Sequence, residues 1–300
     1  MCKWLSGSVI ALIGVSLAGE ASLAGTLERV ASAPRSSSQQ LAAVEPGKAI
    51  SPLSALTQAA ERGELDAQFK LARIHAAGEG VPRSPLKAFR LFHHIVDTYA
   101  DVHPREPRAR RVARAFVALG DYYRSGIQGS AIKADKRRAV SLYRHAASYL
   151  GDADAQFNLA RMYLQGEGVA RNGRLAVNWL TNAAKKRHAK AQALLGDLLW
   201  RGAKGVRRQP LKGLALLILA SQNAKDEAQA RWIEGLLTSA LAHANAHERA
   251  GAKRLAARWQ GRIGQPSARV NPAARAGAAL PRSSGVEGFT AIGLDAAVTR

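Results

Sequence analysis

Hydrophobic residues between about positions 53 and 263 recur every three or four residues, which is the spacing of one face of an α-helix. In the clearest stretch, Ala155, Leu159, Met162 and Tyr163 fall on one helical face. A second helix is expected from about Arg174, with an inner face made of Ala176, Trp179, Leu180, Ala183 and Ala184. The alanines allow two helices to approach closely, and the aromatic rings fill the space between pairs. The pattern predicts helical hairpins with Trp179 in the core; ligand stacking by Trp179 is the alternative.

The hairpin pattern is repeated along the chain. The segment Ala67–Arg73 recurs 88 positions later as Ala155–Arg161, and looser copies begin at Ala115 and Ala191. Four corresponding glycines are spaced by 48, 40 and 36 residues, which gives a period of about 36 with two inserts: Gly78, Gly126, Gly166 and Gly202. A single two-helix unit cannot bury its apolar face alone, so the repeats are expected to stack.

Glycines mark the turn within each predicted hairpin. Gly166 is placed where a left-handed C-cap is needed, and Gly168 allows the following loop to turn. The residues expected to define the repeats structurally are Gly78, Gly80, Gly126, Gly166, Gly168, Gly202, Gly205, Tyr123, Tyr163 and Trp179.

The repeats predict an all-α solenoid over residues 53–224. Ser54–Gly63 is interpreted as the second helix of an incomplete leading unit. Residues 225–264 depart from the repeat and are expected to form a closing helix pair that covers the end of the solenoid.

The two ends of the chain have a different composition. Residues 1–24 are typical of a signal peptide, because Lys3 precedes an apolar stretch that is too short for a membrane span. An uncleaved membrane anchor is the alternative. Residues 25–52 are predicted to be a linker, and residues 265–300 a disordered basic tail.

Composition narrows the possible functions. The chain has 300 residues, 44 Lys plus Arg, 22 Asp plus Glu and a formal charge of +22. Its one cysteine, Cys2, lies in the predicted signal peptide, which excludes an internal disulfide and a cysteine-built metal site in the mature chain. The positive charge favours an anionic partner, although scattered arginines also reflect overall composition.

The repeated residues resemble the Sel1-like repeat family, a relative of the tetratricopeptide repeats. One unit carries the resemblance at Leu159, Tyr163, Gly166, Gly168, Val169, Ala176, Trp179, Ala183 and Ala184. Many of these positions recur in the neighbouring units. The resemblance implies a right-handed α-solenoid that works by binding other proteins.

Within that family, the chain is similar to the periplasmic negative regulators of exopolysaccharide production. The similarity rests on the export signal, the order of the units and the long first insert at 92–101. It implies a periplasmic protein that binds the sensing domain of a membrane histidine kinase and holds the kinase inactive, and it implies release by a periplasmic protease. The basic tail lies outside the resemblance.

No catalytic, cofactor-binding or metal-binding constellation is expected. Common nucleophile, phosphate-loop and zinc-protease motifs are absent from the sequence. His243 and His247 have the spacing of neighbours on one helix and could grip a metal, but a solvated helix face is the preferred interpretation. His93, His94 and His103 near the arginines raise the hypothesis of a pH-dependent interface; surface histidines without such a role are the alternative.

The cluster of arginines that follows the first insert supplies the predicted partner-binding residues: Arg105, Arg108, Arg110, Arg111 and Arg114. They could contact acidic residues or lipid phosphate, and the alternative is a solvated loop. Nucleic acid is not an expected partner, because no aromatic residues alternate with these arginines and the chain carries a predicted export signal. Membrane contact is expected only peripherally.

Two other classes of function remain open. A generic adaptor would bind an acidic protein, polymer or lipid surface through its charge. A periplasmic hydrolase is disfavoured, because the paired cysteines of the cysteine-rich Sel1-repeat proteins proposed for that role are absent here.

Overall fold

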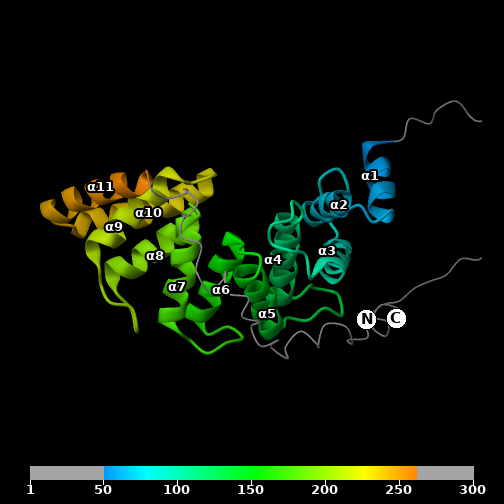
Figure 1. Cartoon of the computed structure of the whole chain (residues 1–300), viewed down its shortest axis with the longest axis horizontal. Helices are drawn as coiled ribbons and strands as arrows, with labels where there is room; N and C mark the ends of the chain where they lie inside the picture. Colours follow the sequence, from blue (N-terminus) through cyan, green and yellow to red (C-terminus); the bar gives the residue numbers. More distant parts are fainter. Residues whose placement is uncertain (1–50, 262–300) are drawn as a thin grey trace, which may run out of the picture. The chain divides into compact units, whose positions relative to one another are not determined.

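The computed structural model describes residues 51–261, which form α-helices joined by loops (Figure 1). The predicted signal peptide, nearly all of the predicted linker and the predicted basic tail lie outside these residues. Apart from an isolated bridge between Ala203 and Val206, the described residues contain no β-structure. The helices are α1 (Pro52–Glu61), α2 (Leu65–Ala77), α3 (Pro85–Tyr99), α4 (Ala109–Ser125), α5 (Lys136–Ser148), α6 (Ala153–Gln165), α7 (Gly173–Lys185), α8 (Ala189–Arg201), α9 (Pro210–Gln222), α10 (Glu227–His243) and α11 (Ala246–Gln260).

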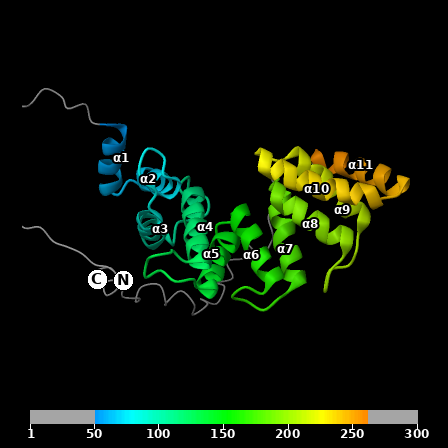
Figure 2. The ribbon, with the colours of Figure 1, turned by 180° about the vertical axis from the view of Figure 1, so that it is seen from behind.

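The helices pack as consecutive hairpins. The pairs α2 and α3, α4 and α5, α6 and α7, and α8 and α9 each pack together, and the second helix of each hairpin also contacts the first helix of the next. Figure 2 shows this order from behind. Helix α1 packs on α2, as expected for the second half of an incomplete leading unit. The predicted all-α solenoid of helical hairpins is confirmed.

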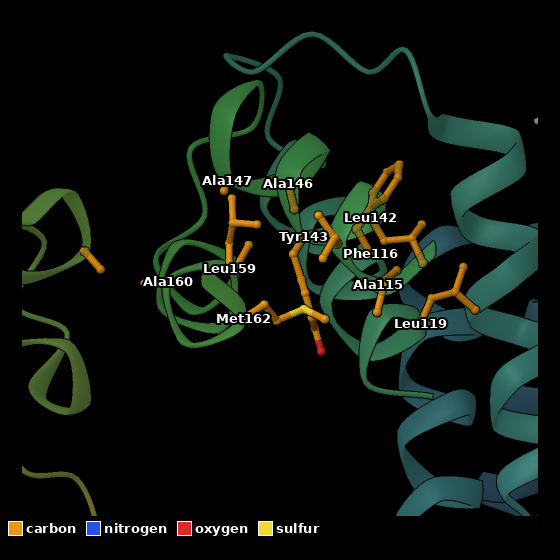
Figure 3. Close-up of a cluster of buried hydrophobic side chains, with 14 of the residues drawn as sticks. Ala115, Phe116, Leu119, Leu142, Tyr143, Ala146, Ala147, Leu159, Ala160 and Met162 are labelled. Atoms are coloured by element: carbon orange, nitrogen blue, oxygen red, sulfur yellow. The ribbon is translucent and has the colours of Figure 1, made fainter. Parts of the chain in front are cut away.

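Small residues at the helix contacts permit this close stacking. Ala139, Ala146, Ala155 and Ala176 are completely buried. A side chain at Gly120 would come within 2.6 Å of the Tyr143 ring, so that ring packs directly on the backbone of α4. Side chains of α4, α5 and α6 converge around Tyr143 (Figure 3).

Seven of the predicted repeat-defining residues are glycines, and all seven have positive φ. Gly166 caps α6 in the left-handed conformation, at φ 74° and ψ 31°. Gly168 has a second role, because a Cβ there would lie 2.4 Å from the backbone of Lys136. The turn of the third hairpin therefore lies against the start of α5 in the preceding hairpin.

The aromatic members of the predicted set differ in burial. Tyr123 and Tyr163 are 6% and 9% exposed. Trp179 is partly buried and packs against the main hydrophobic cluster, so it contributes to the core while one part of its ring stays accessible.

A buried glutamine connects successive hairpins. The side-chain amides of Gln68, Gln156 and Gln192 donate to the carbonyls of Ala60, Ala147 and Ala184, at 3.1, 3.0 and 3.1 Å. Each bond runs from the first helix of a hairpin to the last turn of the helix before it. The glutamines thereby add a donor to carbonyls of the last helical turn. The carbonyls of Ala60 and Ala184 also accept the backbone N–H groups of Gly63 and Arg187, each at 3.0 Å.

The junction between α3 and α4 replaces this glutamine with a histidine contact. Phe116 occupies the corresponding place in α4 and stacks on His145, with ring centroids 4.5 Å apart. The Nε2 atom of His145 lies 3.2 Å from the carbonyl oxygen of Ala100, just after α3. The predicted first insert at 92–101 lies mostly within α3, and the connection between α3 and α4 is residues 100–108.

The last two helices cover the end of the solenoid, but they pack mainly on α9 rather than on each other. Their second hydrophobic cluster includes Leu217, Ile233 and Ala252, which are completely buried. A new helix starts at α11 because Asn245 and Glu248 form a reciprocal capping box at its N-terminus. The expectation that His243 and His247 share one helix face is therefore wrong, since His243 ends α10 and His247 belongs to α11.

Replacing Gln192 with leucine should destabilise the fold by about 1–3 kcal/mol, because two hydrogen bonds of its side chain, each contributing about 0.5–1.5 kcal/mol, would be lost. Gln192 is fully buried and also accepts a hydrogen bond from Asn223 at 2.9 Å. Urea unfolding followed by circular dichroism measures the change. Gln222→Leu, at the exposed end of α9, is the matched control; equal losses in the two variants would contradict the role of Gln192.

Stability should fall as the pH drops below about 6.5. Burial lowers the pKa values of His75 and His145, so the unfolded chain binds protons before the folded chain does. The stability that these neutral imidazoles contribute is fully present above pH 6.5. It is lost as the pH falls from 6.5 towards their lower pKa values in the folded chain. His145→Gln should reduce this pH dependence in urea unfolding between pH 7.5 and 5.5. An equal reduction by His94→Gln, at an exposed position, would count against this explanation.

Candidate protein-interaction surface

The structure separates the five predicted arginines into two groups. Arg105 and Arg108 lie in the loop before α4, while Arg110, Arg111 and Arg114 lie in the first two turns of that helix. All five are exposed. In the loop, Arg108 pairs with Glu106 at 2.6 Å and lies over the Tyr99 ring. One of the two loop arginines is thus already engaged within the chain.

The arginines of α4 line two surface hollows. Arg110 and Arg114 are one helical turn apart and border both of them. The first hollow, of about 720 Å³, is shared with α2, where Arg111 pairs with Asp66 at 2.7 Å. The second, of about 590 Å³, extends past the starts of α6 and α8 to Lys225. The start of α4 therefore joins two concave regions into one basic surface.

The second hollow adds three cations that the prediction missed, namely Lys186, Arg187 and Lys225. Lys186 donates to the carbonyl of Gly151. Within residues 51–261, the side chains of Arg187 and Lys225, like those of Arg110 and Arg114, form no ion pair or hydrogen bond. We call the seven residues Arg110, Arg111, Arg114, Lys186, Arg187, His188 and Lys225 the basic surface.

Carboxylates also line the second hollow, but each one is engaged within the chain. Glu106 holds Arg108, Asp152 accepts the backbone N–H of Ala155 at 2.8 Å, and Asp154 lies 2.9 Å from Nε2 of His188. Because the carboxylates are engaged, the unpaired cations dominate the hollow, which therefore attracts negatively charged groups.

The electrostatics of this region follow from burial and from these contacts. The hydrogen bond from His188 lowers the pKa of Asp154, so this carboxylate stays ionised. Burial raises the pKa of Asp152, which outweighs the N-cap hydrogen bond from Ala155. Burial also lowers the pKa of Lys186.

Arg187 has an unusual backbone conformation. Its φ of 61° makes it the non-glycine residue with positive φ in the described part of the chain. The equivalent residues at two other junctions between hairpins, Gly63 and Gly151, are glycines with φ values of 86° and 69°. An arginine therefore takes the place of a glycine directly beside the second hollow.

The signal that identifies the missed cations is only partly present in the sequence. Lys185–His188 forms a basic run at a junction between hairpins, which could have been recognised as part of the surface. Lys225 carries no such signal, because only the stacking of α10 after α8 and α9 brings it to the same hollow.

The arrangement provides cations at a concave surface, which suits binding of carboxylate-bearing or phosphate-bearing groups. Within the described residues, no group of three or more metal-binding side chains comes together. None of the helices between residues 51 and 261 has the length and apolar content needed to cross a membrane.

These features define a helical-repeat protein with a concave basic surface. The chain belongs to the Sel1 repeat family. The profile of that family matches residues 65–93, 113–148, 153–188 and 189–224, and these ranges correspond to the four hairpins from α2 to α9.

Two similar curated proteins are regulators. The chain is 33% identical over 197 residues to an exopolysaccharide production negative regulator of Rhizobium leguminosarum bv. viciae, covering 66% of this chain and 71% of that protein. It is 31% identical over 207 residues to the protein of the same name from Rhizobium meliloti (strain 1021), covering 69% and 74%.

Solved structures of related folds are more distant. A Sel1 repeat protein from Oxalobacter formigenes is 22% identical, with a TM-score of 0.47 over 63% of this chain and 78% of that one. A protective antigen of uropathogenic Escherichia coli is 21% identical, with a TM-score of 0.45 over 71% of this chain and 49% of that one.

Replacing Arg187 with glycine should stabilise the fold by about 0.5–1 kcal/mol, because relief of the left-handed backbone exceeds the entropy gained by the unfolded chain. Lys186→Gly is the matched control, since Lys186 has an ordinary φ of −89° and its side chain holds Gly151. Thermal and urea unfolding should show opposite signs for the two changes. Destabilisation by Arg187→Gly would contradict a strained backbone at this position.

Proposed function

We propose that this chain is a periplasmic negative regulator of exopolysaccharide production, which binds the sensing domain of a membrane histidine kinase and holds the kinase inactive. The observation that carries the proposal is the 33% identity to a regulator of that name across 71% of its length. A match of 197 residues is much longer than a single repeat of about 36 residues.

The basic surface supports binding of a protein with acidic side chains. Arg110 and Arg114 are exposed and border both hollows, and the second hollow adds the cations of the α7–α8 junction. Arg105 lines neither hollow, and Arg108 is engaged by Glu106. We therefore place the contact at the start of α4 rather than at Arg105 and Arg108.

The periplasmic address rests on the N-terminal sequence. Residues 1–24 combine one lysine with a short apolar stretch and small residues before the proposed cleavage site. A kinase sensing domain in the same compartment would be directly accessible to the exported chain. Cleavage of the regulator by a periplasmic protease would then release the kinase.

A second candidate function is that of an adaptor for anionic polymer or lipid. The formal charge of +22 favours it. The two proposals differ in salt dependence, because purely electrostatic binding collapses between about 50 and 300 mM salt whereas a packed protein interface keeps much of its affinity.

Arg110→Glu combined with Arg114→Glu should weaken binding of the kinase sensing domain about tenfold or more, because the change places repulsive charges against an acidic partner. Isothermal titration with purified sensing domains from the source organism measures the affinity, and circular dichroism checks folding.

Arg137→Glu combined with Arg144→Glu is the matched control, with the same charge change at exposed positions of α5. Equal effects of the two double variants would contradict a defined site. Absence of binding by the unaltered chain to every sensing domain would overturn the kinase proposal.

A further inference from the structure

A separate groove of about 500 Å³ lies between α7, α8, α9 and α11. Its apolar walls come from Val177 and Ala184 of α7, Leu195 and Leu199 of α8 and Leu216 of α9, with Trp259 of α11 at one side. It shares none of its residues with the basic surface. The groove is therefore a second feature that the proposed contact at α4 does not use.

The groove arises where the repeat pattern changes. Leu216 is the seventh residue of α9 and corresponds to Trp179, the seventh residue of α7. Trp179 packs against the main cluster, and at the corresponding place in α9 the smaller Leu216 lines the groove. Leu216 belongs to that main cluster although most of α9 belongs to the second one, and Trp259 contacts both. The groove thus marks the seam between the two hydrophobic clusters.

The rim of the groove carries positive charge. Lys185 and Lys212 line it, both are exposed, and no acidic residue is among its lining residues. Lys212 donates to Gln209 at 2.7 Å, which holds its ammonium at the rim. An apolar floor between lysines is complementary to a surface that combines aliphatic and acidic side chains.

Charge also disfavours occupation by this chain itself. Residues 262–300 contain five arginines and two acidic residues, so they would be repelled by the lysine rim. A second copy carries the same large positive charge. The complementary occupant is consequently an acidic segment from another protein.

We propose that this groove binds an acidic amphipathic helix of a partner protein, with aliphatic side chains against Leu199, Leu216 and Trp259 and carboxylates at Lys185 and Lys212. The inference rests on the proposed function in taking the partner to be a protein. It adds the chemistry of the segment that is recognised.

The test uses the mature chain and a fluorescent synthetic peptide of about 14 residues, roughly four helical turns, with leucines on one face and glutamates on the other. Fluorescence polarisation measures binding. A scrambled peptide of the same composition controls for charge alone, and a peptide with lysines in place of the glutamates controls for apolar binding alone. We expect binding of the first peptide only.

Leu216→Trp restores the larger residue of the preceding repeat and should fill the groove, weakening peptide binding about tenfold or more. Leu175→Trp is the matched control, because Leu175 is an exposed leucine outside the groove. Lys185→Glu combined with Lys212→Glu changes only exposed positions, so it tests the proposal even if the tryptophan disturbs folding. This double variant should lose the glutamate peptide and gain the lysine peptide.

Unchanged binding by Leu216→Trp in a folded protein would overturn the proposal, as would equal binding of the scrambled peptide or failure of the charge exchange. The kinase proposal is tested separately by titration with sensing domains. Loss of peptide selectivity with intact sensing-domain binding rejects the groove alone, and the reverse result rejects the kinase proposal alone.

Discussion

The stacking of hairpins depends on one recurring constraint, which is that the last turn of a helix must find hydrogen-bond donors while it is covered by the next hairpin. Gln68, Gln156 and Gln192 provide those donors from the following helix. At the α3–α4 junction His145 reaches Ala100 instead. Together with the buried alanines at the helix contacts, these bonds tie each hairpin to its neighbour. The position of each surface residue depends on that stacking.

Much of the fold could be predicted because it depends on local, repeated signals. Period-3.6 patterning identifies the helices, and recurring glycines such as Gly166 mark their ends. The break that separates His243 from His247 also had a local signal, since Asn245 and Glu248 have capping-box spacing. The buried glutamines recur at the same position of three repeats, which the sequence shows. Only the structure shows that Gln192 reaches the carbonyl of Ala184.

The interaction surfaces were less predictable because they combine distant segments. Arg110 and Arg114 were recognised as part of a basic cluster, yet the sequence could not show that Arg108 is engaged by Glu106. Lys225 joins the same hollow only through packing. The apolar groove depends on a substitution within the repeat, Leu216 in place of a tryptophan, and on a helix outside the repeats. Both surfaces arise where the repeats differ from one another. Identical repeats would present identical surfaces, so selective binding requires such differences.

The central claim is that this chain regulates a histidine kinase by contacting its sensing domain through the start of α4. The most direct measurement places a photo-crosslinking amino acid at Arg110 or, as a control, at the exposed Tyr149 of the full chain, and identifies the crosslinked species from intact cells. The account predicts a histidine kinase sensing domain as the major product from position 110 and its absence from position 149. Crosslinks from position 110 to polymer or lipid alone, or the same products from both positions, would contradict it.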